Sequence, residues 1–117
     1  MKTLVHRFVE YIPDQIEERV LYITMQYRTA VHNCVCGCGN KVVTPITPTD
    51  WSFWFDGETV SLYPSIGNWS FKCKSHYFIR KNKIYHARKW EDWEIEANRE
   101  KDIENKKEFF KSRENEN

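Results

Sequence analysis

The first 90 residues alternate short apolar and aromatic runs with turn-forming residues. Runs of this length, rich in β-branched and aromatic residues and bounded by Gly, Pro, Asn or Asp, are typical of β-strands. They predict strands at 4–9, 20–27, 41–44, 51–55, 59–62, 77–80 and 83–86. Asp56-Gly57 and Lys81-Asn82 each separate two such runs, so both predict tight hairpins.

The pattern changes after Trp90. Residues 91–117 hold ten acidic and six basic residues and neither proline nor glycine. Good helix formers with charges at helical spacing predict a helix from Trp93 to about Phe110, followed by a frayed tail from about Ser112. The apolar residues are too sparse for a continuous stripe, so we expect this helix to pack only near its start. The chain thus divides into a β-rich domain, 1–90, and a charged helix with a tail, 91–117.

All four cysteines lie in two short segments, 32–39 (HNCVCGCG) and 73–76 (CKSH). Zinc takes four sulfur or nitrogen ligands, commonly supplied as two local pairs on tight turns. The two segments therefore predict one zinc site, with a preferred ligand set of Cys36, Cys38, Cys73 and His76. Cys34 is either an alternative ligand or a thiol beside the site, and the spacing does not choose between these two roles.

Two other interpretations compete with a zinc site. Three cysteines within five residues are poorly placed to form disulfides with one another, and Cys73 alone would leave two thiols unpaired. Plain packing of buried thiols is the second alternative. Among metals, the mixed cysteine and histidine set favours zinc over an iron–sulfur cluster.

The size of the chain makes a bound metal useful. With 117 residues it forms one domain whose apolar core is marginal, and metal binding adds to the free energy of folding. The fold class we predict is therefore mainly β with a C-terminal helix, a small α+β fold in which zinc staples a β-hairpin domain. No apolar run approaches the roughly 20 residues of a membrane span, and the N-terminus lacks a secretory signal. We therefore expect that the protein does not associate with membranes and that it resides in the reducing cytoplasm.

The net charge of +1 hides an asymmetry, since the first 90 residues carry twelve bases and seven acids. Seven of these bases lie between Lys72 and Lys89, and aromatic residues are threaded among them. Such a patch binds nucleic acid in some proteins, with the aromatics stacked on bases. The alternative is a solvated hairpin edge, where lysines discourage unwanted strand pairing. The candidate patch consists of Lys72, Lys74, Arg80, Lys81 and Lys83.

Segment 63–69 (YPSIGNW) is rich in turn formers. It is either the crossover that leads to Cys73 or a loop that meets a partner or substrate near the metal. In the second case the contacting residues are Tyr63, Ser65, Asn68 and Trp69.

Residues 32–90 resemble a family of small, largely uncharacterised bacterial Cys/His domains. The matching motifs are HxCxCGCG at 32–39, FDG at 55–57, VSLxPSIGNW at 60–69 and CxSHYxI at 73–79. Genes for that family often lie beside genes for multi-ubiquitin-like proteins, ubiquitin-activating-type enzymes and deubiquitinase-like peptidases. The resemblance implies a zinc-binding accessory or adaptor protein of a bacterial ubiquitin-like conjugation pathway with a link to antiviral defence. The implied partner is an activating-type enzyme or a ubiquitin-like protein.

Three functions remain open at this point. The first is the adaptor, a binding module in which four protein ligands close the metal site and leave no position for a catalytic water. The second is a metal- or thiol-dependent enzyme, with Cys34 as nucleophile or with a general base drawn from Asp50, Glu58, His32 and His86. The chain lacks the HExxH, HxE…PCxxC and phosphate-loop motifs, so we expect binding rather than catalysis. The third is nucleic-acid binding through the basic patch, which is a weaker expectation at this net charge.

Overall fold

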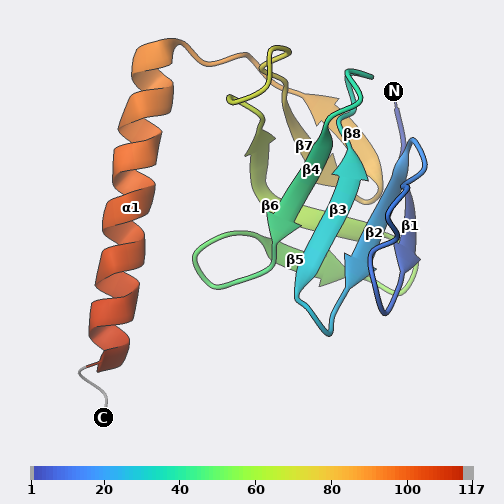
Figure 1. Ribbon diagram of the computed structural model, residues 1–117, viewed down its shortest axis with the longest axis horizontal. Coiled ribbons are helices and arrows are strands. Elements are labelled where there is room, and N and C mark those ends of the chain that lie inside the picture. The colour runs from blue at the N-terminus through green and yellow to red at the C-terminus, as the bar shows by residue number, and fades with distance from the viewer. Residues whose placement is uncertain (1, 115–117) are drawn as a thin grey trace.

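The computed structural model describes residues 2–114 as two four-stranded sheets followed by one long helix (Figure 1). The first sheet has the strand order β1-β2-β3-β4, with β1 parallel to β2 and the other pairs antiparallel. Its strands are β1 (Val5–Phe8), β2 (Val20–Thr24), β3 (Thr29–Asn33) and β4 (Lys41–Pro45). The second sheet is an antiparallel meander of β5 (Ser52–Phe55), β6 (Val60–Gly67), β7 (His76–Arg80) and β8 (Lys83–His86). The prediction of a mainly β protein with a C-terminal helix is confirmed.

The core lies between the two sheets, which pack face to face. Leu21 and Ile23 from β2 are fully buried against Leu62 of β6 and Ile79 of β7 in one apolar cluster. Burying each of these side chains contributes roughly 1.5–3 kcal/mol to the free energy of folding. At the edge, the amide of Leu4 donates to the carbonyl of Asn82 at 2.7 Å, which ties the start of the chain to the second sheet.

Two segments differ from the strands expected from the sequence. The run 20–27 ends as a strand at Thr24, because residues 25–28 form a turn in which Arg28 has a φ of 49°. A further strand, β3, then begins at Thr29 and was not predicted. Strand β6 continues to Gly67 through a register shift between Leu62 and Ile66, so most of the segment expected as a loop is strand.

Helix α1 (Asp92–Glu114) begins one residue before the expected start and runs beyond the expected end. Ile95 is buried near its start, as the prediction of packing there requires. Further along, Lys106 donates to Asp50 at 3.0 Å and so holds the helix beside the loop that precedes β5. The last part of the expected tail, residues 115–117, lies outside the described residues. None of the helical structure described here has the length and apolar character needed to cross a bilayer.

A buried hydrogen bond links the two sheets. His32 of β3 and Tyr77 of β7 are both fully buried, and His32 Nε2 lies 2.6 Å from the Tyr77 hydroxyl. Burial lowers the pKa of His32 to about 4 and raises the pKa of Tyr77, so the imidazole accepts and the phenol donates. Tyr77 faces the core, so it is not one of the aromatics available to stack on a base.

Replacing Tyr77 with phenylalanine is expected to lower the free energy of unfolding by about 1–3 kcal/mol. The change removes only a hydroxyl, but it leaves the buried His32 ring without its partner. Urea unfolding followed by tryptophan fluorescence measures the loss. Tyr85→Phe is the matched control because Tyr85 is 40% exposed, and it should change the value by less than about 0.5 kcal/mol. Equal effects of the two substitutions would contradict the role given to the buried bond.

Candidate active site and thiol cluster

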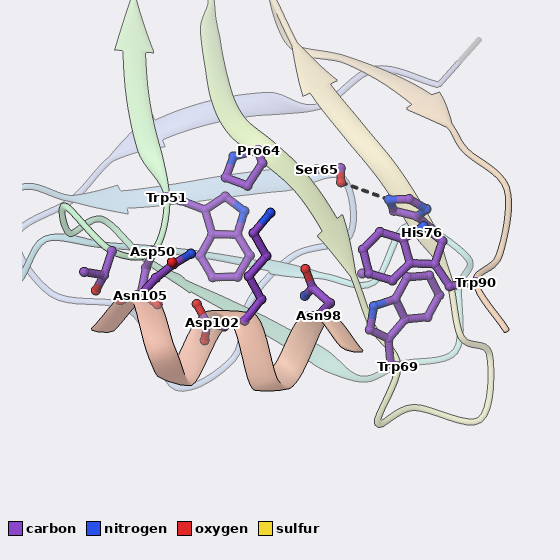
Figure 2. A pocket seen from close by; sticks show the side chains of 13 residues that line it. Asp50, Trp51, Pro64, Ser65, Trp69, His76, Trp90, Asn98, Asp102 and Asn105 are labelled. Atoms are coloured by element: carbon purple, nitrogen blue, oxygen red, sulfur yellow. Dashed lines mark hydrogen bonds between the residues drawn. The ribbon is translucent and has the colours of Figure 1, made fainter. Parts of the chain in front are cut away.

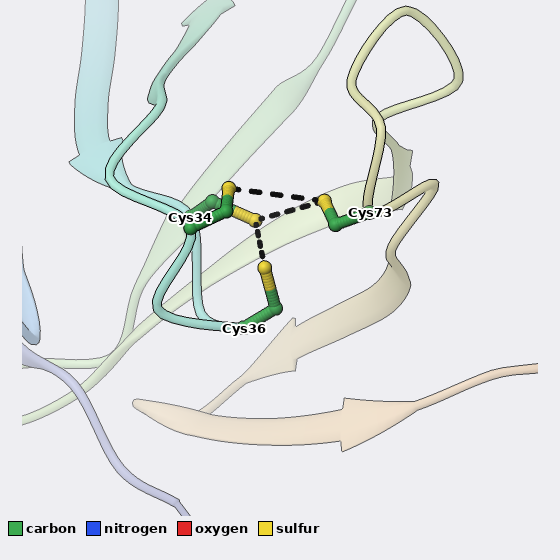
Figure 3. A group of neighbouring side chains, drawn as sticks. Cys34, Cys36 and Cys73 are labelled. Carbon is green, nitrogen blue, oxygen red and sulfur yellow. Dashed lines mark hydrogen bonds between the residues drawn. The ribbon is translucent and has the colours of Figure 1, made fainter.

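The four cysteines lie together, and Figure 3 shows three of them, Cys34, Cys36 and Cys73, facing one another. Cys34, Cys36 and Cys38 lie on the loop between β3 and β4, and Cys73 lies on the loop between β6 and β7. All four sulfur atoms lie within 4.8 Å of one another. Cys34 Sγ is 3.5 Å from Cys36 Sγ and 3.8 Å from Cys73 Sγ, while Cys38 Sγ is also 3.8 Å from Cys73 Sγ.

The first loop folds back on itself because two glycines take left-handed backbone angles. Gly37 and Gly39 have φ values of 85° and 82°, which residues with a Cβ rarely adopt. The turn is closed by the Cys34 amide, which donates to the Asn40 carbonyl at 2.8 Å. This conformation turns three sulfurs of a short segment toward the one sulfur of the second loop.

The surroundings of the four thiols give them different pKa values. Burial raises the pKa of Cys34, and burial together with the neighbouring thiols raises the pKa of Cys36 to about 12. Burial opposes ionisation of Cys73, but hydrogen bonds from the hydroxyl and amide of Ser75 outweigh it and lower its pKa to about 6. The amide of Asn40 lowers the pKa of Cys38. Two of the four thiols are thus prepared to carry negative charge.

The donor set fits a tetrahedral metal ion. Zinc–sulfur bonds of 2.3 Å in a tetrahedron place neighbouring sulfurs about 3.8 Å apart, which is close to the separations seen here. Asn68 Nδ2 donates to the Ser75 hydroxyl at 2.8 Å, and that oxygen lies 3.1 Å from Cys34 Sγ. Hydrogen bonds of this kind orient metal-binding thiolates. The cluster is therefore able to hold a metal ion.

His76, expected to be the fourth ligand, lies elsewhere. Its neighbour Ser75 faces the thiols, and since side chains alternate along a strand, His76 of β7 points to the other face of the sheet. Both of its ring nitrogens have partners outside the cluster. The geometry thus groups Cys34 with Cys36, Cys38 and Cys73, and it separates His76 from them.

His76 instead forms a hydrogen-bonded pair with Ser65 (Figure 2). Its Nε2 lies 2.9 Å from the Ser65 hydroxyl, and its Nδ1 lies 2.7 Å from the carbonyl oxygen of Arg88. A carbonyl only accepts hydrogen bonds, so Nδ1 carries the proton. In the neutral ring Nε2 is then the acceptor, and the Ser65 hydroxyl donates to it.

Neighbouring structure holds this pair in place. Gly67 of β6 pairs with His76 of β7, and Ser65, two residues before Gly67, therefore lies on the same side of the sheet as the histidine and diagonal to it. The Trp69 and Trp90 rings stack at 5.1 Å, and each meets the His76 ring edge-on, at 5.1 and 5.4 Å. Gly67 has to lack a side chain here, because a Cβ would lie 2.5 Å from the Trp69 ring.

The Arg88 carbonyl is fixed by the start of α1. The guanidinium of Arg88 makes two hydrogen bonds to Glu94, at 2.7 and 2.8 Å, and Glu94 also accepts from the Glu91 amide at 3.1 Å. The arginine holds the pKa of Glu94 at about 2, so this ion pair persists well below neutral pH. The helix thus anchors the segment whose carbonyl orients the histidine.

A cavity of about 460 Å³ opens in front of Ser65 and His76. Figure 2 shows α1 along one side of it, opposite the strands that carry the pair. The helix contributes polar side chains, while the strands and loops contribute aromatic ones. Ser65 therefore borders an open space between a helix wall and a sheet wall.

The other residues singled out from the sequence are dispersed. Asn68 is buried beside the thiols and Trp69 lines the cavity, whereas Tyr63 is 41% exposed on β6. Of the bases considered for an enzyme, His32 is buried against Tyr77 and Asp50 is bound to Lys106. Glu58 and His86 are exposed and do not line the cavity.

Both members of the pair stand out in the sequence, but their pairing does not. Ser65 was assigned to a possible partner loop and His76 to the metal. Eleven residues separate them, and only the register of β6 with β7 brings them together. The serine stands in no local motif of a known nucleophile, so nothing in the neighbouring sequence marked it as one.

These features define a small β protein with a serine–histidine pair and a cluster of four thiols. A backbone carbonyl orients the histidine, and the pair lies on the side of the sheet opposite to the one that faces the thiols. Residues 8–87 match the family model described as bacterial ubiquitination-like system serine protease (BubE), so the chain belongs to the BubE family. No curated protein and no solved structure gives a significant match. The predicted association with a ubiquitin-like conjugation system is supported by this family.

Proposed function

We propose that this protein is a serine hydrolase of a bacterial ubiquitination-like system that cleaves an acyl bond in a protein substrate. One observation carries the proposal: Ser65 donates to His76 Nε2 at 2.9 Å while Nδ1 of the same ring is held by a carbonyl. A nucleophile, a base within hydrogen-bond reach and a group that orients the base are the three parts of such a site. The description of the family as a serine protease supports the same chemistry.

The roles follow from the positions of the protons. Ser65 Oγ attacks the substrate carbonyl carbon and its proton passes to His76 Nε2, which makes the ring a cation. The Arg88 carbonyl stabilises the remaining Nδ1 proton of that cation. His76 then returns the proton to the leaving amine as the acyl bond breaks. Water, deprotonated by the same nitrogen, releases the acyl group from Ser65 and restores the starting state.

The metal in this proposal is zinc, held by Cys34, Cys36, Cys38 and Cys73. Four thiolates prefer zinc among the common divalent ions, and the sulfur separations suit its bond length. A closed set of four protein ligands contributes to folding and leaves no open position for a substrate. Bound there, a zinc ion would hold the loop that contains Cys73 and leads into β7 and His76.

The family also bears on partners. Membership of a ubiquitination-like system supports a protein substrate, and a ubiquitin-like protein or its conjugate is the partner that an acyl-bond hydrolase of such a system would act on. The adaptor role expected from the sequence has no comparable support from the geometry. It is kept as the function that would stand if the serine proved unreactive.

A fluorophosphonate probe tests the proposal directly, because it reacts with serines whose hydroxyl is activated by a base. Zinc-loaded protein should gain one adduct, and peptide mapping should locate that adduct on Ser65. Ser70→Ala is the matched control, since Ser70 is exposed on the neighbouring loop and contributes nothing to the pair. Labelling that survives in Ser65→Ala, or an adduct mapped to a cysteine, would contradict the proposal.

A further inference from the structure

The outer side of the second sheet is aromatic and basic rather than polar. Along β7, Tyr77 and Ile79 face the core, so His76, Phe78 and Arg80 project from the opposite side. The register places Tyr85 of β8 beside Phe78.

The same side continues across the other strands. Lys83 of β8 pairs with Arg80, whose guanidinium lies 3.6 Å from the centre of the Tyr63 ring on β6. Trp54 of β5 pairs with Ser61 and is 66% exposed. We call this surface the outer face, and it consists of Trp54, Tyr63, Phe78, Arg80, Lys83 and Tyr85. Three large aromatic side chains on it are 40–66% exposed, which is unusual unless a partner covers them.

The outer face runs into the candidate active site. The Phe78 ring lies 6.0 Å from the His76 ring on the same side of β7. Tyr63 precedes Pro64 and Ser65, both of which line the cavity. A chain lying on this face therefore reaches the serine without crossing another element.

The segment from residue 59 to 90, which includes most of the outer face, carries only positive charges. Residues 59–90 contain seven bases and no acid. Two of the bases are neutralised by the start of α1, since Lys74 lies 3.6 Å from Asp92 and Arg88 pairs with Glu94. Within residues 2–114, Arg80 and Lys83 form no ion pair. Of the five bases left over, Arg80 and Lys83 lie on the outer face, and Lys72, Lys81 and Lys89 are not part of it.

We propose that the outer face docks an acidic segment of the protein substrate, whose apolar side chains pack on Trp54 and Tyr85 while its carboxylates meet Arg80 and Lys83. This inference rests on the proposed function for the identity of the docked chain as substrate. Complementary charge steers and orients such an encounter, and exposed aromatics supply the contact area. Nucleic acid fits the face less well, because two of the aromatics that lie among the bases of segment 72–90 are engaged elsewhere: Tyr77 is buried and Trp90 stacks on Trp69.

The experiment measures binding and catalysis separately. Two short fluorescein-labelled peptides are used, both with alternating Leu and Phe, one interspersed with Glu and the other with Lys. Fluorescence anisotropy follows their binding to Ser65→Ala, which does not consume them. Hydrolysis of p-nitrophenyl acetate by protein with an intact Ser65 reports the serine chemistry, since this ester is too small to touch the outer face.

The acidic peptide should bind at least about tenfold more tightly than the basic one, and raising salt from about 0.05 to about 0.5 M should reduce the difference. Adding Lys83→Glu should weaken acidic-peptide binding about tenfold or more, and Trp54→Ala should weaken binding of both peptides. Arg28→Glu is the matched charge control, because Arg28 is exposed on the turn between β2 and β3 in the other sheet. With Ser65 intact, none of these three changes should alter ester hydrolysis.

Equal binding of the two peptides, or equal effects of Lys83→Glu and Arg28→Glu, would overturn the docking surface. So would displacement of the acidic peptide by single-stranded DNA that binds more tightly. A different result would separate the two proposals. If the protein bound the acidic peptide tightly through Lys83 but neither hydrolysed the ester nor reacted with fluorophosphonate, the docking surface would be supported and the proposed catalysis would be contradicted.

Discussion

Ser65→Ala is expected to reduce ester and protein hydrolysis by zinc-loaded protein by about a thousandfold or more. Loss of the nucleophile of a serine hydrolase commonly removes catalysis on this scale, whatever the binding energy left in the site. The fold should persist, because Ser65 is only partly buried and its side chain, within the part of the chain that the structure describes, is hydrogen-bonded to His76 alone. Initial rates with p-nitrophenyl acetate measure the loss, and circular dichroism checks the fold.

Ser70→Ala again serves as the control, with a rate expected within a factor of about two of the unchanged protein, as for other exposed positions. A second treatment separates the serine from the thiols. If Ser65→Ala kept its rate and alkylation of the cysteines removed it, Cys73 would be the nucleophile, since it has the pKa of about 6.

Cys34→Ser is expected to remove the metal and to destabilise the whole domain. Cys34 is fully buried and its sulfur lies within 3.8 Å of those of Cys36 and Cys73. At free zinc about a thousand times its dissociation constant, binding contributes about 4 kcal/mol, so its loss lowers the melting temperature by roughly 12–24 °C. Differential scanning calorimetry measures that shift, and elemental analysis measures the zinc.

Chelation of the unchanged protein should give the same fall in melting temperature, and added Zn²⁺ should restore it while Mg²⁺ does not, because thiolates do not bind magnesium well. Activity should fall together with zinc, since Ser75 contacts Cys34 and precedes His76 directly. If Cys34→Ser kept one zinc and an unchanged melting temperature, Cys34 would not be a metal ligand but a thiol beside the site.

The sequence predicted the thiol cluster better than it predicted its members. Cysteine is rare and chemically distinctive, so four of them in two short segments pointed to one site, and the fold does bring them together. The three-residue offset between Cys73 and His76 favoured the histidine as a ligand. That spacing describes a loop, whereas β7 begins at His76 and turns consecutive side chains to opposite faces.

The serine–histidine pair was not predictable from local patterns. It depends on the register of β6 against β7 after a shift between Leu62 and Ile66, and a register is set by contacts across the sheet rather than by neighbours in sequence. Strand β3 was missed for a related reason. Its five residues lead directly into the cysteine loop, and His32 was considered as a general base and as the start of the HxCxCGCG motif, although it is a buried partner of Tyr77.

The most direct test of the account is the native mass spectrum of His76→Ala after treatment with zinc and a fluorophosphonate, because one spectrum reports both the bound metal and the adduct. We expect one zinc and no adduct, since the histidine activates Ser65 and takes no part in the thiol cluster. A spectrum showing loss of zinc together with an undiminished adduct would contradict it. Such a result would restore His76 as a metal ligand and leave Ser65 without its base.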